Sequence, residues 1–220
     1  MNVCPLVYLA GRRLLILALS GLLLTGCAGS PTPRYYSLNA ALAAAPAPAN
    51  NTYSGQSAKA IGIGPITLPE AVDRPQLVLS QGTGEVTLAQ GHRWAGSLKQ
   101  DIALLLAAHL TRRLGDHPPI AAYPQSIAVD APYQVTLDMT RFAASLGGEA
   151  HVEALWTVRG GSDSPPLRKR GVYRAAVQAH ASGTEHAAVV AAYVQALLTL
   201  GDDLAKDLAP LCPTPPGITP

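Results

Sequence analysis

Residues 133–140, YQVTLDMT, and residues 151–158, HVEALWTV, are the two stretches of sequence that decide the fold. In each of them apolar and polar side chains alternate, and a period of two residues is typical of a strand with one buried face. Gly147 and Gly148 lie between the two stretches, where a tight turn needs glycine. Together they predict an antiparallel hairpin in the middle of the folded part.

Further strands and two helices are expected on either side of this hairpin. Short alternating runs predict strands at residues 61–66, 77–79, 85–88 and 171–179. Apolar residues spaced three and four apart predict a helix from Trp94 to Leu114. A capping box, Ser182 to Glu185, predicts a second helix that runs to about Leu208. The expected fold class is therefore α/β: a single domain whose mixed β-sheet, with an antiparallel section, is packed by two long helices.

The first 26 residues predict a secretory signal peptide. Arg12 and Arg13 are followed by an uncharged, leucine-rich run over residues 14–24. That run has about 11 residues, and at roughly 1.5 Å per residue it is much shorter than a hydrocarbon core of about 30 Å. We therefore do not expect it to persist as a membrane-spanning helix.

Leu24, Thr25 and Gly26, followed by Cys27, resemble the bacterial lipobox. The resemblance implies cleavage before Cys27 and attachment of diacylglycerol and a palmitate-type acyl chain to this residue. Each buried methylene contributes about 0.8 kcal/mol, so two or three acyl chains hold a protein on a membrane almost permanently. The alternative, an ordinary buried cysteine in a longer helix, is disfavoured because a proline- and alanine-rich stretch follows directly.

The residue after Cys27 is Ala28, and not the aspartate that usually marks retention in the inner membrane of enteric-type bacteria. The expected location is therefore the outer membrane, lipid-anchored and facing the periplasm, with the inner membrane as the less favoured alternative.

Composition divides the chain into four expected parts. Residues 1–26 are the lipoprotein signal peptide, and residues 27–58 are the lipidated N-terminus with a flexible Ala/Pro-rich tether. An apolar, strand-prone island at Tyr35–Leu38 interrupts this tether and is a candidate for an added strand. Residues 59–209 form the α/β domain, and residues 210–220 form a Pro-rich disordered tail.

Charge and cysteine content exclude some classes of function. The chain has 16 Lys and Arg against 14 Asp and Glu, and two of the arginines belong to the expected leader. A neutral mature protein lacks the basic face that a nucleic-acid partner requires, so none is expected. Cys4 leaves with the leader and Cys27 is acylated, so that Cys212 alone remains and an internal disulfide is excluded.

The sequence contains no pattern that predicts catalysis or a metal site. Its six histidines lack ligand spacing, and His109, on or beside the apolar face of the first helix, is expected to be a satisfied core or boundary histidine. The glycines Gly62 and Gly64 are half of a nucleotide-binding fingerprint at most, and Pro65 would remove a phosphate-binding N–H. A solvent-facing position is expected for three carboxylates of the last helix, namely Asp202, Asp203 and Asp207. We expect a protein that is not an enzyme and that needs no cofactor beyond the covalent lipid on Cys27.

One basic run, Arg168-Lys169-Arg170, allows two interpretations. The simpler one is a solvated edge of a hairpin. The other is an electrostatic contact with lipid headgroups or with an acidic partner.

A family resemblance begins at residues 62–69, GIGPITLP, and continues at residues 73–78, DRPQLV. These two blocks resemble the PqiC-like family, the ABC-type transport auxiliary lipoproteins. The sequence departs from the family pattern at Ala71-Val72, where an aromatic residue and a leucine are common. The lipobox, Tyr35–Leu38, the tryptophan Trp94 and the last helix agree in order.

Within the second block, the sequence singles out a structural or partner-facing motif that consists of Pro69, Asp73, Arg74, Pro75 and Gln76. The prolines fix a bend between two strands. Asp73 and Arg74 either brace this bend or face a partner, and bracing is the favoured interpretation.

The resemblance implies a non-enzymatic docking subunit of an MCE-type transporter, which moves phospholipids or other hydrophobic molecules between the inner and outer membranes. The expected partners are the membrane, through the anchor, and an MCE-domain transporter protein, and a homo-oligomer is compatible with this role. Two alternatives remain: a periplasmic lipid-binding carrier, which needs a cavity of roughly 300–1,000 Å³, and an exported hydrolase, which needs convergent polar groups.

Overall fold

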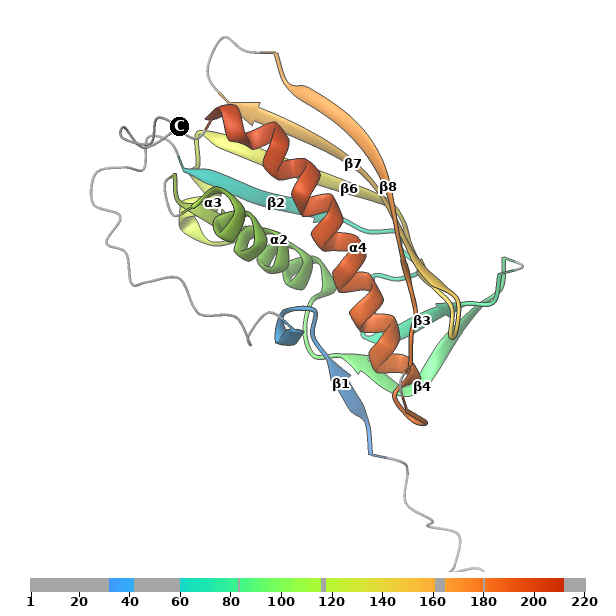
Figure 1. Cartoon of the computed structure of the whole chain (residues 1–220). Helices are drawn as coiled ribbons and strands as arrows, with labels where there is room; N and C mark the ends of the chain where they lie inside the picture. The colour runs from blue at the N-terminus through green and yellow to red at the C-terminus, as the bar shows by residue number, and fades with distance from the viewer. Residues whose placement is uncertain are drawn as a thin grey trace, which may run out of the picture. The chain divides into compact units, whose positions relative to one another are not determined.

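The computed structural model describes residues 32–41, 60–82, 84–115, 118–160, 165–179 and 181–211. Within them, two β-sheets and two long helices share one hydrophobic core (Figure 1). The α/β class predicted from the sequence is confirmed, but the strands form two sheets where one was expected.

The larger sheet has five strands in the order β5-β2-β6-β7-β8. The predicted hairpin is its centre: β6 (Tyr133–Ala144) and β7 (Glu149–Gly160) pair antiparallel, and β8 (Leu167–Ala176) pairs antiparallel with β7. On the other side β2 (Ile61–Thr67) pairs parallel with β6 and with the short β5 (Ile120–Ala122). The sheet is therefore mixed, with the predicted antiparallel section.

The smaller sheet has three strands in the order β1-β4-β3. The N-terminal strand β1 (Arg34–Tyr36) pairs parallel with β4 (Val86–Trp94), and β4 pairs antiparallel with β3 (Gln76–Ser80). The island seen in the sequence is therefore an added strand, although it joins the smaller sheet. The fully buried side chain of Leu38, whose N–H donates to the Asp101 carboxylate at 3.1 Å, then fixes this segment to the domain.

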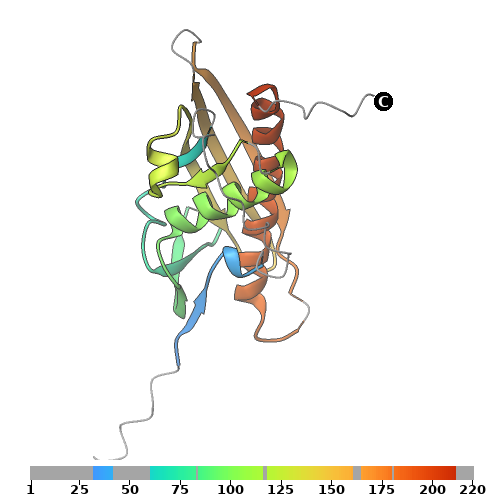
Figure 2. The same cartoon turned by 90° about the vertical axis from the view of Figure 1, so that its left-hand side faces the viewer.

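Two long helices, α2 (Leu98–Leu114) and α4 (Glu185–Leu208), lie together on one face of the five-stranded sheet. The short α3 (Ser126–Val129) lies on the opposite face (Figure 2). Single 3-10 turns, η2 (Asn39–Ala41) and η4 (Ala209–Leu211), follow β1 and α4. α4 with η4 is long and apolar enough to cross a bilayer, but most of its apolar stretch is buried in the fold, as in a core helix.

Two predicted helix starts are wrong. Trp94 is the last residue of β4, where it pairs with Tyr36 of β1, and α2 begins only after the N-cap Ser97. The capping box also fails, because α4 begins at Glu185 after Thr184, and the Glu185 carboxylate accepts from the N–H of Gly183. The spacing of Trp94 also suits a helix, but this residue is part of a strand because β4 pairs with β1.

Of the three α4 carboxylates that were expected to face solvent, Asp207 is buried, whereas Asp202 and Asp203 are 39% and 40% exposed and also make contacts within the fold. Asp207 accepts from the Trp156 indole N–H at 3.0 Å and pairs with Lys169. Asp203 accepts from the Tyr173 hydroxyl at 3.1 Å, and Asp202 accepts from His109 of α2 at 2.9 Å. These contacts fasten α4 to β7, β8 and α2, a role that only the packed structure reveals.

Candidate functional site: a groove beside a bend

The motif that the sequence singled out forms a tight bend between β2 and β3. The carbonyl of Pro69 accepts from the N–H groups of Val72 and Asp73 at 3.0 and 3.2 Å. At the end of the bend the Pro75 carbonyl accepts from the N–H of Trp94 at 2.8 Å, which attaches the bend to β4. The two prolines thus lie at the two hydrogen-bonded ends of the bend.

An ion pair joins this bend to the first turn of α2. Asp73 Oδ2 lies 2.6 Å from Lys99 Nζ, and both side chains are partly exposed. Arg74, by contrast, is exposed and has no carboxylate within ion-pairing distance in the described part of the chain. Gln76 begins β3, half-buried, directly opposite Arg93. The geometry therefore gives Asp73 a bracing contact and leaves Arg74 facing solvent.

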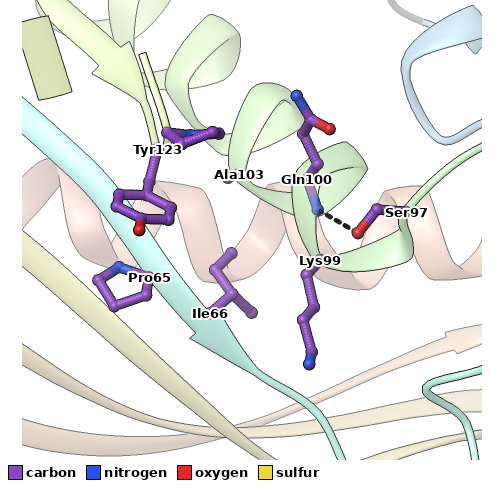
Figure 3. A pocket seen from close by; sticks show the side chains of 8 residues that line it. Pro65, Ile66, Ser97, Lys99, Gln100, Ala103 and Tyr123 are labelled. Carbon is purple, nitrogen blue, oxygen red and sulfur yellow. Dashed lines mark hydrogen bonds between the residues drawn. The ribbon is translucent and has the colours of Figure 1, made fainter. Parts of the chain in front are cut away.

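Next to Lys99 lies a shallow groove of about 270 Å³ (Figure 3). The end of β2, the first turns of α2 and the segment after β5 line it with Pro65, Ile66, Ser97, Lys99, Gln100, Ala103, Tyr123 and Pro124. Most of this lining is apolar, and the side chains of Ser97, Lys99 and Gln100 add polar groups from one side. Such a groove suits an apolar segment that carries an acidic or hydrogen-bonding group.

The apolar character continues from the groove onto the surface. Tyr123 is 44% exposed, and Ile127 and Val129 of α3, a few residues further along the chain, are also exposed. Exposed apolar groups that lie together are a feature of interaction sites, whereas single ones are common on any surface.

The glycine-rich block 62–65 builds one wall of this site. Gly62 faces α3 so closely that a Cβ there would lie 2.3 Å from the carbonyl oxygen of Ala128. Gly64 has a positive φ of 113° and lies against the Cβ of Tyr123. Both glycines are therefore needed for close packing of the segment 123–128, and this explains the block without a phosphate ligand.

The described residues contain no cluster of three or more His, Cys, Asp or Glu side chains that could hold a metal ion. His109 is accounted for by its contact with Asp202, whose carboxylate also pairs with Arg113 at 3.0 Å. We find no nucleophile, base and oxyanion donors that converge on the groove in this part of the chain.

The basic run of β8 is divided between two faces of the sheet. Lys169 points to α4 and pairs with Asp207, whereas Arg170 pairs with Glu153 on the opposite face. Arg168 lies on the same face as Arg170, beside Thr157. The run therefore includes structural contacts, and it does not form one continuous basic patch.

A second cluster links β1 to α4. The Tyr36 hydroxyl lies 2.8 Å from Nδ1 of His92, and the rings of His92 and His186 stack with centroids 3.6 Å apart. Arg34 Nη1 donates to the carbonyl of Gly183 at 2.9 Å. Burial, and then the charge of Arg34, lower the pKa of His92, while burial and then His92 itself lower the pKa of His186. Sequence reasoning missed this cluster because its members are up to 152 positions apart, from Arg34 to His186.

The lipobox residues Leu24, Thr25 and Gly26 and the expected lipidation site Cys27 lie outside the described residues. The lipidated cysteine therefore stays a prediction from the sequence.

Comparisons with known proteins point to one family. The sequence profile of the ABC-type transport auxiliary lipoprotein component matches residues 36–205. A solved structure described only as an uncharacterized protein has a TM-score of 0.60 at 15% identity, covering 80% of this chain and 99% of its own. A Xanthomonas campestris protein of the DUF330 family has a TM-score of 0.51 at 20% identity, covering 72% of this chain and 89% of its own.

More distant is the PelC dodecamer from Paraburkholderia phytofirmans, with a TM-score of 0.39 at 13% identity, covering 70% of this chain and 86% of its own. No curated protein is similar enough in sequence to count as a relative. At these identities the two likenesses with a TM-score above 0.5 establish the fold alone.

Proposed function

Because this chain belongs to the family of ABC-type transport auxiliary lipoprotein components, we propose that it is the lipid-anchored docking subunit of an MCE-type transporter. In this proposal Cys27 carries the lipid, the outer membrane holds the protein on its periplasmic side, and the partner is an MCE-domain protein. The transported molecules are phospholipids or other hydrophobic molecules that pass between the two membranes. The protein itself contributes no chemical step.

The observation that carries the proposal is the convergence of the family blocks on one exposed groove. Pro65 and Ile66 of the first block line the groove, and Asp73 of the second block pairs with Lys99, which also lines it. Family blocks that contribute to an exposed, mostly apolar surface support a partner-binding role. A purely structural role would not require Tyr123, Ile127 and Val129 to be exposed beside them.

A lipid-binding carrier is the second candidate, and the groove argues against it. At about 270 Å³ it falls below the roughly 300–1,000 Å³ typical of sites that enclose a small molecule. The side chains between the helices and the sheet form one continuous buried core, which further supports docking over carriage.

Docking is tested by crosslinking the tagged full chain in intact envelopes and identifying its partners by mass spectrometry. We expect recovery of an MCE-domain protein, and we expect Tyr123→Asp to reduce this recovery about tenfold or more, as for the loss of a central apolar contact. Leu155→Asp is the matched control, because Leu155 of β7 is similarly exposed, at 42%, and does not line the groove. Recovery of phospholipid without any MCE-domain protein would instead support the carrier.

The anchor is tested by metabolic labelling with radioactive palmitate. We expect Cys27→Ala to abolish the label, because no other residue offers the lipobox thiol. Cys212→Ala is the control and should keep full labelling. Label that persists in the Cys27→Ala chain would disprove the anchor.

A further inference from the structure

The three-stranded sheet begins very close to the proposed lipid anchor along the chain. Arg34, the first residue of β1, comes only seven positions after Cys27 in the chain. An extended chain covers at most about 3.3–3.6 Å per residue, so β1 begins within about 25 Å of the anchored cysteine. The flexible tether that the sequence predicts for residues 27–58 would have allowed several times that distance between Cys27 and the domain. The fixing of β1 to β4 and of Leu38 in the core removes this freedom.

One face of this sheet is open and carries an exposed aromatic side chain beside an arginine. Tyr35 and Arg93 are register neighbours on β1 and β4, and Gln76 of β3 pairs with Arg93 on its other side. Tyr35 is 63% exposed and Arg93 is exposed too. The alternate residues Tyr36 and Trp94 turn inward, where Trp94 contacts the core. Val86 and Leu88 of β4 add exposed apolar groups to the same sheet.

The arginine on this open face has no ion-pair partner among the described residues. Arg93 has no carboxylate within 4 Å in the part of the chain that the structure describes, whereas two lysines and two arginines of β8 and α4 are ion-paired, namely Lys169, Arg170, Arg174 and Lys206. Arg34, on the inner face with Tyr36, lies near Glu185 and donates to the Gly183 carbonyl. Arginine binds phosphate oxygens through its planar fork, and tyrosine is enriched at the headgroup level of membranes.

We propose that the open β1–β4 face, defined by Tyr35 and Arg93, rests on the anionic phospholipid headgroups of the membrane that carries the anchor. This inference depends on the proposed lipidation of Cys27. The short link brings the face to the membrane, and Arg93 and Tyr35 then fix the orientation of the domain. In both views of the structure α3 lies well away from β1, so this orientation leaves α3 away from the lipid (Figures 1 and 2).

The test uses the full lipidated chain, reconstituted in vesicles of phosphatidylethanolamine and phosphatidylglycerol that contain a brominated phospholipid. Tyr35→Trp introduces a fluorescent reporter at the face, and Ile127→Trp, at a residue 43% exposed on α3, is the matched control. The native Trp94 and Trp156 are buried and supply the background that the wild type measures. We expect bromine to quench the reporter at position 35 at least twice as strongly as the reporter at position 127.

Removing the positive charge of Arg93 should weaken the contact of the β1–β4 face with the lipid headgroups, while the lipid anchor should still hold the protein on the membrane. Each arginine near an anionic surface contributes about fivefold to the contact equilibrium. Arg93→Gln, combined with Tyr35→Trp, should therefore weaken the quenching at position 35. The use of vesicles without phosphatidylglycerol should weaken it as well, and this second comparison needs no further variant. Attachment to the vesicles through the lipid should be unchanged in both.

Equal quenching at positions 35 and 127, or quenching that is indifferent to phosphatidylglycerol, would overturn the membrane-facing assignment while leaving the anchor intact. Crosslinking of position 35 to a protein in native envelopes, without quenching by lipid in vesicles, would also overturn the membrane-facing assignment. A chain that does not stay with the vesicles at all would refute the anchor, and with it this inference.

Discussion

At Gly62 the identity of one residue is set by the backbone of another element. The position lies in the buried strand β2, and α3 passes so near that a Cβ would lie 2.3 Å from the Ala128 oxygen. The pattern of glycines was visible in the sequence, but the partner that requires it was not. A bend or a ligand-binding loop would have shown the same residues.

Gly62→Ala should therefore destabilise the protein, because α3 must move to admit the methyl group. Overpacking of this kind costs about 1–3 kcal/mol, and we expect it to appear as a lower midpoint of urea unfolding. Gly96→Ala is the control, since nothing lies within 4 Å of the Cβ it would add and its φ is not in the left-handed region. Equal midpoints for the two variants would contradict the close approach of α3.

On the scale of elements, α4 is held to the sheet by carboxylates as well as by apolar packing. The Asp207 side chain is only 6% exposed, and it satisfies both the Trp156 indole of β7 and the Lys169 ammonium of β8. The helix period predicted which apolar residues face the core. It could not show that the neighbouring strands place donors opposite the polar residues at the edge of that face.

Asp207→Ala should lower the free energy of unfolding by about 1–3 kcal/mol, because it leaves a buried indole N–H and a lysine without their acceptor. Lys206→Ala, which changes a 74% exposed side chain next to it, should stay within about 0.5 kcal/mol of the wild type. Chemical denaturation followed by circular dichroism measures both. An unchanged midpoint for Asp207→Ala would show that the contact contributes nothing to stability.

The stacked histidines that join β1 to α4 should make stability depend on pH. The folded state lowers the pKa of His92 and of His186 below 6.5, so the unfolded chain binds more protons as the pH falls below that value. The stability that these groups contribute is therefore complete above about pH 6.5 and is lost as the pH falls through the lowered pKa values. Arg34 and Glu185 also face the pair, with opposite effects on the pKa of His186.

We expect the thermal midpoint to fall between about pH 7.5 and pH 5, and we expect the double variant His92→Gln, His186→Gln to lose less over the same range. His151, whose pKa is also lowered by burial and by Arg174 and Arg141, keeps part of the dependence in this variant. Parallel curves for the two proteins would rule out a contribution from the stacked pair.

On the scale of the whole molecule, the two sheets depend on one core. Leu38 and Leu77 from the smaller sheet's segments, Leu137 of the larger sheet and Leu197 of α4 belong to the same cluster of buried side chains. Tyr193 of α4 stacks on Phe142 of β6 at 4.1 Å and lies 6.4 Å from Trp94 of β4, so aromatic rings connect both sheets through the helix.

The described domain should therefore unfold in a single cooperative transition. Far-ultraviolet circular dichroism and the fluorescence of Trp94 and Trp156, one in each sheet, should give the same midpoint in denaturant. Phe142→Ala should lower both midpoints together, by about 3–5 kcal/mol in stability. Two separate transitions, one for each tryptophan, would contradict the shared core.

Short-range patterns in the sequence were enough for several features of this protein. Alternation gave the β6–β7 hairpin, the apolar period gave α4 and most of α2, and the family blocks singled out the bend at Asp73. Such patterns are reliable because they depend only on the neighbouring residues in the chain and on whether each side chain faces water.

The tertiary structure alone decided where these pieces meet. Trp94 ends a strand and not the start of a helix because β1, some 60 residues earlier, offers it a parallel partner. The groove, the Asp73–Lys99 pair and the histidine stack likewise bring together residues from separate elements. A hydrogen bond or contact between distant residues forms only after the core has brought their elements together, and no local pattern records which elements those will be.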